Sequence, residues 1–310
     1  MSPLEQAVAD YLSLRRALGF KLERAERLLG QFVGYLADHD VEVITTEVAL
    51  AWAVLPAGAD PRWWDHRLAT VRTFAAYLHA LDPRVEVPAA GLIRCRPLRA
   101  TPYLYTDAEV AALITAAGTL RHPLRAATHQ TLIGLLASTG MRVGEVIGLD
   151  HSDFDTATGM LTVRDAKFSK SRLIPLHPTG VSAVSRYLRR RDELLPACTS
   201  PALFVSLRGR RLRYNDVWRT FHQLTEQAGL SARSSSCRPR IHDLRHSFAV
   251  ATVLDGYARG DDHDVQALLP TLSTYLGHAD PKHTYWYLSA APELLALAGQ
   301  RLETSRRRPR

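Results

Sequence analysis

The sequence predicts a mainly α-helical protein of two domains, in which the second domain contains a small antiparallel β-sheet. Its 310 residues correspond to about two domains at roughly 150 residues each. Apolar residues recur at the three- and four-residue spacing of amphipathic helices along much of the chain. A proline- and arginine-rich stretch separates two such regions, and short strand-like runs follow it. These three observations favour a helical first domain, a linker and an α+β second domain.

The first domain, residues 1–82, is predicted to be a compact all-helical unit. Gly19 interrupts the apolar pattern of residues 4–38, which indicates two antiparallel helices. Threonine often caps the N-terminus of a helix, and proline is tolerated in the first turn but ends a helix that reaches it. Two further helices are therefore predicted, from Thr45 or Thr46 to Leu55 and from Pro61 to Pro83.

Residues 83–102 are predicted to be an extended basic linker. They contain four prolines and four arginines and have little periodic pattern. Proline restricts the chain to extended or turn conformations and removes a backbone donor, so such a stretch does not continue a helix. The second domain is then expected over residues 103–310.

The second domain is predicted to be helical around a small sheet. Thr106 and Glu109 have the spacing of a capping box, which starts one helix, and another is expected from Pro123 to Ser138. Strands are predicted at Met160–Arg164, Arg172–Leu176 and Leu203–Ser206. The chain from Tyr214 onward is expected to be mainly helical, with an inserted loop at Gly256–Asp264 and a last helix at Glu293–Leu302.

The charge balance predicts a polyanionic partner. There are 39 basic and 31 acidic residues, a formal charge of +8, and the sequence pI is about 9.6. Nine arginines and three acids lie between Ser206 and Arg245. This stretch is either a solvated face with a flexible serine-rich loop or a surface that follows DNA phosphates, with Tyr214 and Trp218 nearby. Charge alone does not decide between these two interpretations.

Cysteine usage and hydropathy predict a soluble cytoplasmic protein with no membrane association. The three cysteines, Cys95, Cys198 and Cys237, fit neither a disulfide framework nor a C-x-x-C site. The N-terminus lacks the pattern of a signal peptide, and no run of about 18 apolar residues occurs.

Several kinds of chemistry are excluded or disfavoured by missing motifs. The sequence has no G-x-x-x-x-G-K, no G-x-G-x-x-G and no G-x-S-x-G, so ATP, dinucleotide and elbow-serine chemistries lose support. His242 and His246 have the spacing of a zinc pair, but Arg245 lies between them and would repel a dication. The cluster Asp261, Asp262, His263 and Asp264 fits a turn and helix N-terminus better than a metal site. No metal and no cofactor are therefore predicted.

A phosphodiester can be broken without a metal by a nucleophile, fixed positive charge and an acid for the leaving oxygen. Four segments together supply these groups. They are Thr139-Gly140-Met141-Arg142-Val143-Gly144-Glu145, the hairpin Ala166-Lys167-Phe168-Ser169-Lys170-Ser171-Arg172, His242-Asp243-Leu244-Arg245-His246, and Leu276-Gly277-His278 followed nine residues later by Tyr287.

In this order and combination, the four segments resemble the tyrosine recombinase (phage integrase) family. The resemblance covers essentially the whole chain, because Tyr11-Leu12 through Leu18-Gly19-Phe20 is similar to that family's SAM-like core DNA-binding domain. The resemblance implies a two-domain, C-shaped clamp that closes around double-stranded DNA.

The resemblance also implies a role for each site residue. Tyr287 would attack the phosphate, Arg142 and Arg245 would bind its non-bridging oxygens, His278 would donate a further hydrogen bond, Lys167 would protonate the leaving 5′ oxygen, and His242 would orient the phosphate or assist proton transfer. Glu145 would hold an active-site side chain in place. Because Ala166 and Phe168 replace the family's usual glycines, Lys167 and Lys170 both stay open as the acid.

The implied function is site-specific recombination or integration through a covalent 3′-phosphotyrosine, in a homo-tetramer on DNA that can include other recombinases of the same element. The sequence around Tyr287 resembles that of transposon-encoded members of the family. The alternatives are type IB topoisomerase activity and a catalytically silent DNA-binding accessory protein. The last helix either docks into a neighbouring protomer or packs on its own domain.

Overall fold

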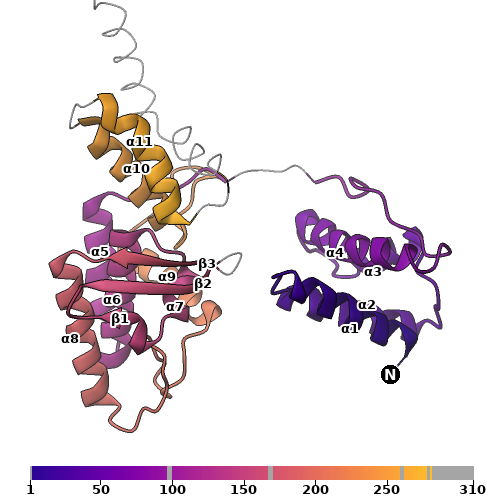
Figure 1. Ribbon diagram of the computed structural model, residues 1–310, viewed down its shortest axis with the longest axis horizontal. Helices are drawn as coiled ribbons and strands as arrows, with labels where there is room; N and C mark the ends of the chain where they lie inside the picture. The colour runs from indigo at the N-terminus through magenta and orange to yellow at the C-terminus, as the bar shows by residue number, and fades with distance from the viewer. Residues whose placement is uncertain (1, 96–99, 167–169, 259–261, 278–279, 281–310) are drawn as a thin grey trace, which may run out of the picture. The chain divides into compact units, whose positions relative to one another are not determined.

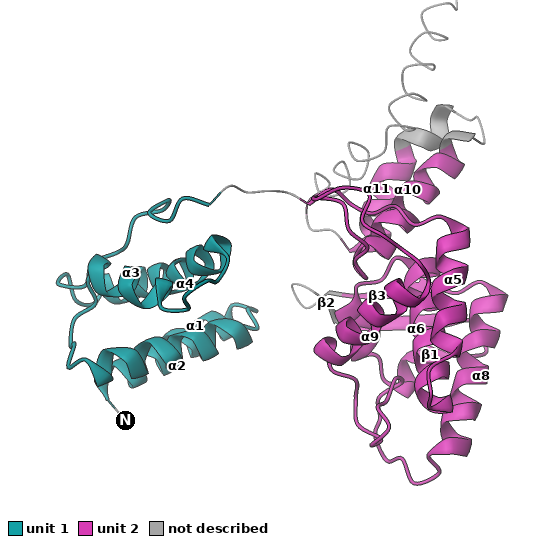
Figure 2. Cartoon of the chain, turned by 180° about the vertical axis from the view of Figure 1, so that it is seen from behind, with its two compact units in different colours: residues 1–99 teal, residues 100–310 magenta. Residues whose placement is uncertain are grey.

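The structure is a computed structural model that describes residues 2–95, 100–166, 170–258, 262–277 and 280 (Figure 1). The chain divides into two compact units, Met1–Arg99 and Ala100–Arg310, shown in different colours in Figure 2. Each unit has its own buried core. None of the helices in the described part of the chain is long and apolar enough to cross a membrane.

The first unit contains the four predicted helices. They are α1 (Pro3–Ala17), α2 (Glu23–Asp38), α3 (Thr46–Val54) and α4 (Pro61–His79). Local signals set their starts, since Thr45 caps α3 and Asp60 caps α4 just before Pro61. Phe32 and Trp52 meet edge to face in the core, with ring centroids 5.1 Å apart.

Residues 83–95, the described start of the predicted linker, pack against this first unit. Val85 is buried in its core, and the backbone amide of Glu86 donates to the carbonyl of Ile44 at 2.9 Å. The side chain of Arg72 donates to the carbonyl of Pro88 at 2.8 Å. Basic and proline-rich composition therefore does not keep this segment away from the helices. The domain bounds stay predictions.

The second unit is built around helix α6. Its helices are α5 (Asp107–Gly118), α6 (Pro123–Thr139), α7 (Val143–Gly148), α8 (Pro178–Leu194), α9 (Tyr214–Gln227), α10 (Asp243–Ala258) and α11 (Asp262–Leu276), with a 3₁₀ turn at His151–Asp153. Helix α6 contacts α5, α8 and α10 and buries Leu132, Ile133 and Leu136. Helix α8 was not predicted, although Pro178 in its first turn and His177 at its cap are N-terminal signals.

The small sheet has three antiparallel strands in the order β1 (Phe154–Asp155), β2 (Met160–Ala166) and β3 (Lys170–Pro175). The strand predicted at Leu203–Ser206 is wrong. That segment makes only isolated bridges, such as Val205 with Arg211, among the described residues. Its apolar side chains fill the core instead, where Phe204 stacks on Tyr187 with ring centroids 5.1 Å apart.

The loop predicted at Gly256–Asp264 is wrong at both of its ends, because α10 continues to Ala258 and α11 begins at Asp262. A Cβ added to Gly256 would lie 2.3 Å from Leu268 of α11. This glycine therefore permits two helices to pack closely and does not mark a turn. The last helix predicted at Glu293–Leu302 lies outside the described residues.

Replacing Gly140 by alanine tests the packing at the end of α6. Gly140 has φ +61°, and an added Cβ would lie 2.4 Å from the Phe248 ring of α10. We expect Gly140→Ala to lower the free energy of unfolding by at least about 2 kcal/mol, from backbone strain and overpacking. Urea unfolding followed by circular dichroism measures this loss.

Gly144→Ala is the matched control, since Gly144 lies in α7 and an added Cβ meets nothing within 4 Å. It should stabilise the protein by up to about 1 kcal/mol through helix propensity. Equal losses in the two variants would contradict the close approach of Phe248.

Candidate active site

Two of the predicted site arginines meet where the ends of four helices come together. Arg245, in the first turn of α10, donates from Nη1 to the carbonyl of Gly140 and from Nη2 to the carbonyl of Leu276, each at 2.8 Å. Arg142, which precedes α7, donates from Nη2 to the carbonyl of Gly277 at 3.2 Å. The ends of α6 and α11 and the starts of α7 and α10 therefore form one site.

The helix ends explain why a guanidinium group is stable there. The last carbonyls of an α-helix have no partner within the helix and carry the negative end of its dipole. Arg245 is only 2% exposed and binds such carbonyls at two helices. The side chain of Arg142 is 31% exposed, so part of it stays open to a ligand.

Glu145 joins Arg142 to a third arginine. Its carboxylate accepts from Arg142 Nη1 at 2.8 Å and from the backbone amide of Arg142 at 2.9 Å. It also accepts from Arg172 Nη2 at 2.7 Å and from Arg172 Nη1 at 3.1 Å. Burial alone would raise the pKa of Glu145, but the hydrogen bonds and charges of Arg172 and Arg142 lower it to about 2. The carboxylate is therefore ionised at neutral pH.

Arg172 is a site residue that our sequence prediction missed. It lies on β3, and its Nη1 is 3.0 Å from the position a Cβ would take on Gly277, which has φ +69°. The two-residue alternation of a strand places Arg172 on the same face as Ile174. Ile174 is fully buried, whereas Leu173 between them is 60% exposed. An inward-facing arginine in a strand indicates a buried acceptor.

His242 immediately precedes α10 and lies three residues before Arg245 in the sequence. Its ring meets that of His246 edge to face, with centroids 5.3 Å apart. Although the side chain is open to solvent, desolvation by nearby protein atoms and then the charges of Arg245, Arg142 and Arg240 lower the pKa of His242 to about 4. The ring is therefore neutral at pH 7, and it is a weaker base than a free imidazole.

Three of the predicted site residues, Lys167, His278 and Tyr287, lie outside the described residues. Lys170 is the first residue of β3 and pairs with Ala166 of β2. The structure thus brings together Arg142, His242 and Arg245 from the predicted set.

The carboxylate of Asp243, which lies between the two histidines in the sequence, makes its short hydrogen bonds with other groups, while His246 Nε2 lies 3.9 Å from it. Asp243 is fully buried and accepts from Arg240 Nε at 2.9 Å and from the backbone amide of Tyr103 at 3.2 Å. Over the described ranges, no group of three or more His, Cys, Asp or Glu residues is placed to hold a metal ion. Asp243 instead links Tyr103, near the start of this unit, to the first turn of α10, which carries Arg245.

Comparison with known proteins identifies related chains. A model described as "Phage integrase family" matches residues 104–293. The putative integrase/recombinase y4rB of Sinorhizobium fredii is 44% identical over 309 residues, covering 98% of each chain. The tyrosine recombinase XerD of Pseudomonas aeruginosa is 32% identical over 250 residues, covering 78% of this chain and 75% of that protein. The fold is similar to that of the Tn1549 transposon integrase in complex with a circular intermediate DNA, with 16% identity, a TM-score of 0.64 and coverage of 96% and 98%.

Glu145→Gln tests the electrostatics of the site. Folding lowers the pKa of Glu145 from 4.5 to about 2, so its ionised form stabilises the folded state above pH 4.5 and this stabilisation is lost as the pH falls towards 2. The glutamine side chain does not titrate, so the variant lacks this dependence of stability on pH. We expect the difference in unfolding free energy between wild type and variant to shrink by up to about 3 kcal/mol over that range. Urea unfolding at a series of pH values measures it.

Glu193→Gln provides the control, because Glu193 pairs with Arg190 on the surface and its side chain is 61% exposed. Because an exposed ion pair contributes little, this variant should change the unfolding free energy by less than about 1 kcal/mol at every pH measured. A pH-independent difference for Glu145→Gln would contradict the ionised, doubly paired carboxylate.

Proposed function

The chain belongs to the phage integrase family, and we propose from this membership which of its residues cut and rejoin DNA. The protein is a site-specific tyrosine recombinase that breaks and rejoins DNA strands through a covalent 3′-phosphotyrosine. Relatives named as integrases, recombinases and XerD favour this function over a topoisomerase or a silent accessory protein. Mobilisation of the DNA element that encodes the protein is part of the proposal.

The observation that carries the assignment is that Glu145 pairs with Arg142 and Arg172, while Arg142 and Arg245 donate to the adjacent carbonyls of Gly277 and Leu276. Three guanidinium groups and one carboxylate leave an excess of positive charge that an anion balances. In the proposal, Arg142 and Arg245 bind the non-bridging oxygens of the scissile phosphate and stabilise the charge that develops during attack. Glu145 and Arg172 act as positioning residues for Arg142.

The chemistry proceeds without an external energy source. The phenol oxygen of Tyr287 forms a bond to phosphorus, and the bond from phosphorus to the 5′ oxygen breaks. His242, neutral at pH 7, receives the phenol proton or orients the phosphate, while Lys167 gives a proton to the leaving oxygen and His278 donates to a non-bridging oxygen. A 5′ hydroxyl of another strand reverses these steps and releases Tyr287, so the phosphodiester energy is conserved.

The proposed assembly is a homo-tetramer on DNA, which can include other recombinases of the same element. Strand exchange needs cleavage of both strands in each of two duplexes, and one nucleophile per chain requires four chains. In this assembly the segment Glu293–Leu302 docks into a neighbouring protomer.

Tyr287→Phe tests the nucleophile. We expect the wild-type protein, incubated in EDTA with a nicked cognate duplex that traps the cleaved strand, to form an SDS-resistant, protease-sensitive adduct. Phenylalanine lacks the attacking oxygen, so Tyr287→Phe should form none, while Tyr285→Phe should retain the adduct. The spacing after Leu276-Gly277-His278 selects Tyr287 over Tyr285 as the nucleophile. An adduct formed by Tyr287→Phe would contradict the nucleophile assignment. Loss of the wild-type adduct in EDTA would contradict the metal-free mechanism.

A sulfur-substituted substrate decides between the two lysines. A 5′-thiolate is a much weaker base than an alkoxide and leaves without a proton donor. Lys167→Ala should therefore cleave the ordinary duplex at least about a hundredfold more slowly, and a bridging 5′-sulfur should restore most of that rate. Lys170→Ala should show no such restoration; the opposite pattern would assign the acid to Lys170.

A further inference from the structure

The second, catalytic unit begins with a segment that is bound along one side of helix α10. This segment, residues 101–105, lies directly before the cap of α5 and belongs to no helix or strand. The backbone amide of Tyr103 donates to Oδ2 of Asp243 at 3.2 Å, and the backbone amide of Tyr105 donates to Oγ of Ser247 at 2.7 Å. We call residues 101–105 the strap, because two of its amides are bound by side chains of α10.

The spacing of these two hydrogen bonds matches the geometry of both partners. Asp243 and Ser247 are four residues apart, so they lie one above the other on the same side of a helix. Tyr103 and Tyr105 are two residues apart, so in an extended chain their amides point to the same side, about 7 Å apart. Helix α10 therefore binds the strap as a neighbouring strand would, with side-chain oxygens in place of carbonyls.

The two side chains of α10 are themselves fixed by further bonds. The carboxylate of Asp243 is buried and also accepts from Arg240, at 2.9 Å from Nε and at 2.8 Å from Nη2. The hydroxyl of Ser247 donates its proton to the backbone carbonyl of Asp243 at 3.0 Å, so it is oriented to accept from the strap. Both acceptors are thus in place on the helix, with little freedom to move.

The strap is anchored to the core of the unit by its two tyrosine rings. Tyr103 is 2% exposed, and its hydroxyl donates to Glu109 of α5 at 2.6 Å. Tyr105 is 7% exposed, and its hydroxyl donates to the carbonyl of Arg240 at 3.1 Å. The two rings lie against each other, with centroids 4.8 Å apart. A densely packed segment of this kind is a rigid support for the helix that it contacts.

Arg245 lies between the two strap contacts in the sequence and on the other side of the helix. Successive residues of an α-helix are rotated by about 100°, so Arg245 points about 200° away from both Asp243 and Ser247. On that side its guanidinium donates to the carbonyls of Gly140 and Leu276, at 2.8 Å each. The first turn of α10 is thus bound from two opposite sides, by the strap and by the ends of α6 and α11.

We propose that Asp243 and Ser247 are positioning residues for Arg245, and that they act by fixing the rotation of α10 against the strap. The proposal rests on the proposed function for the role of Arg245 at the scissile phosphate. A helix with its side chains has a radius of about 5 to 6 Å, so a rotation of about 10° moves the tips of the side chains by about 1 Å. A displacement of that size in a catalytic group slows a reaction by up to about a hundredfold.

Ser247→Ala tests the proposal, and Thr252→Ala is the matched control. Both hydroxyls lie on α10, are half-buried and donate to the carbonyl four residues earlier, while that of Ser247 also accepts from the strap. At saturating cognate DNA, we expect Ser247→Ala to form the covalent adduct at least about tenfold more slowly than wild type, with its affinity for the duplex unchanged. Thr252→Ala should stay within about twofold of wild type. Equal rates in the two variants would overturn the proposal.

Asp243→Asn tests the other strap contact. Asparagine keeps the shape of the side chain, but an NH₂ group that cannot accept from Tyr103 or Arg240 replaces one carboxylate oxygen. We expect adduct formation to slow by at least about tenfold at saturating DNA, as for Ser247→Ala. A wild-type rate in this variant would overturn the assignment of Asp243.

A methylphosphonate at the cleaved position separates the positioning of Arg245 from general damage to the protein. Replacing one non-bridging oxygen by a methyl group removes the charge that a guanidinium stabilises there. On the diastereomer that lacks the oxygen bound by Arg245, the deficit of Ser247→Ala should fall to within about twofold of wild type. A deficit of the same size on both diastereomers and on the ordinary duplex would overturn the proposal.

Proton exchange at the guanidinium of Arg245 needs no DNA, and it distinguishes failure of the proposal from failure of the proposed function. The Nη protons are measured in nitrogen-15 spectra and assigned by the signal that Arg245→Lys lacks. We expect them to exchange with water at least about tenfold faster in Ser247→Ala than in wild type or Thr252→Ala; unchanged exchange would overturn the proposal. If exchange rose while Tyr287→Phe retained the adduct, the nucleophile would be wrong and the positioning of Arg245 would stand.

Discussion

The catalytic unit depends on one buried cation, the guanidinium of Arg245. It lies in the first turn of α10 and binds the carbonyls of Gly140 and Leu276, at the ends of α6 and α11. A buried guanidinium is costly unless its donors are satisfied, and helix ends are costly unless their carbonyls are. Each group satisfies the other. Stabilising the three-helix junction therefore also fixes a positive charge where a phosphate is proposed to bind.

Glu145 extends this arrangement from helices to the sheet. Its carboxylate holds Arg142 at the start of α7 and Arg172 on β3, and Arg172 packs against Gly277 at the end of α11. Glycine at that position leaves room for the guanidinium. The charges around the scissile phosphate are thus set before DNA binds, which is the condition under which electrostatic stabilisation of a transition state costs least.

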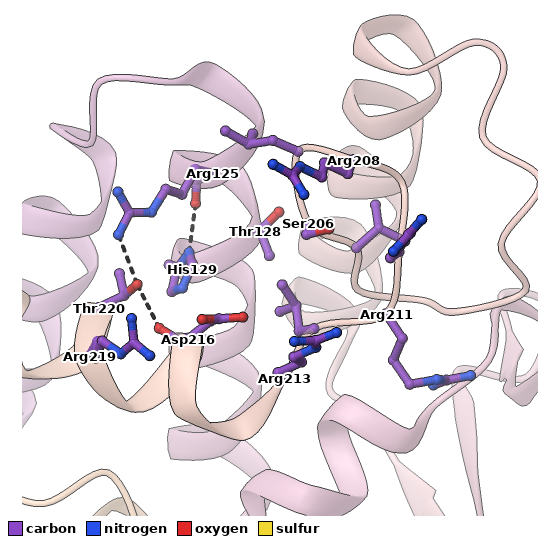
Figure 3. A pocket seen from close by; sticks show the side chains of 14 residues that line it. Arg125, Thr128, His129, Ser206, Arg208, Arg211, Arg213, Asp216, Arg219 and Thr220 are labelled. Atoms are coloured by element: carbon purple, nitrogen blue, oxygen red, sulfur yellow. Dashed lines mark hydrogen bonds between the residues drawn. The ribbon is translucent and has the colours of Figure 1, made fainter.

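Arginine has two physical roles in this unit. Arg142, Arg172 and Arg245 are held by backbone carbonyls and a carboxylate, so their geometry is fixed. Arg208, Arg210, Arg213 and Arg219 are exposed around a pocket that α6, the segment 205–213 and α9 line (Figure 3), and they have no ion pairs in the described residues. Fixed charge suits one reacting phosphate, whereas exposed charge suits a backbone that is bound at many positions and released by salt.

The sequence by itself determined the helices that begin with local signals and the ordered set of reactive residues. Caps and prolines located α3, α4, α5 and α6, because these signals act within one turn of a helix. Only the tertiary structure decided that Phe204 belongs to the core and not to a strand, and that Gly256 marks a helix contact and not a loop. Likewise, the partners of Arg245 are carbonyls, which every residue has, so no pattern of side chains could have identified them.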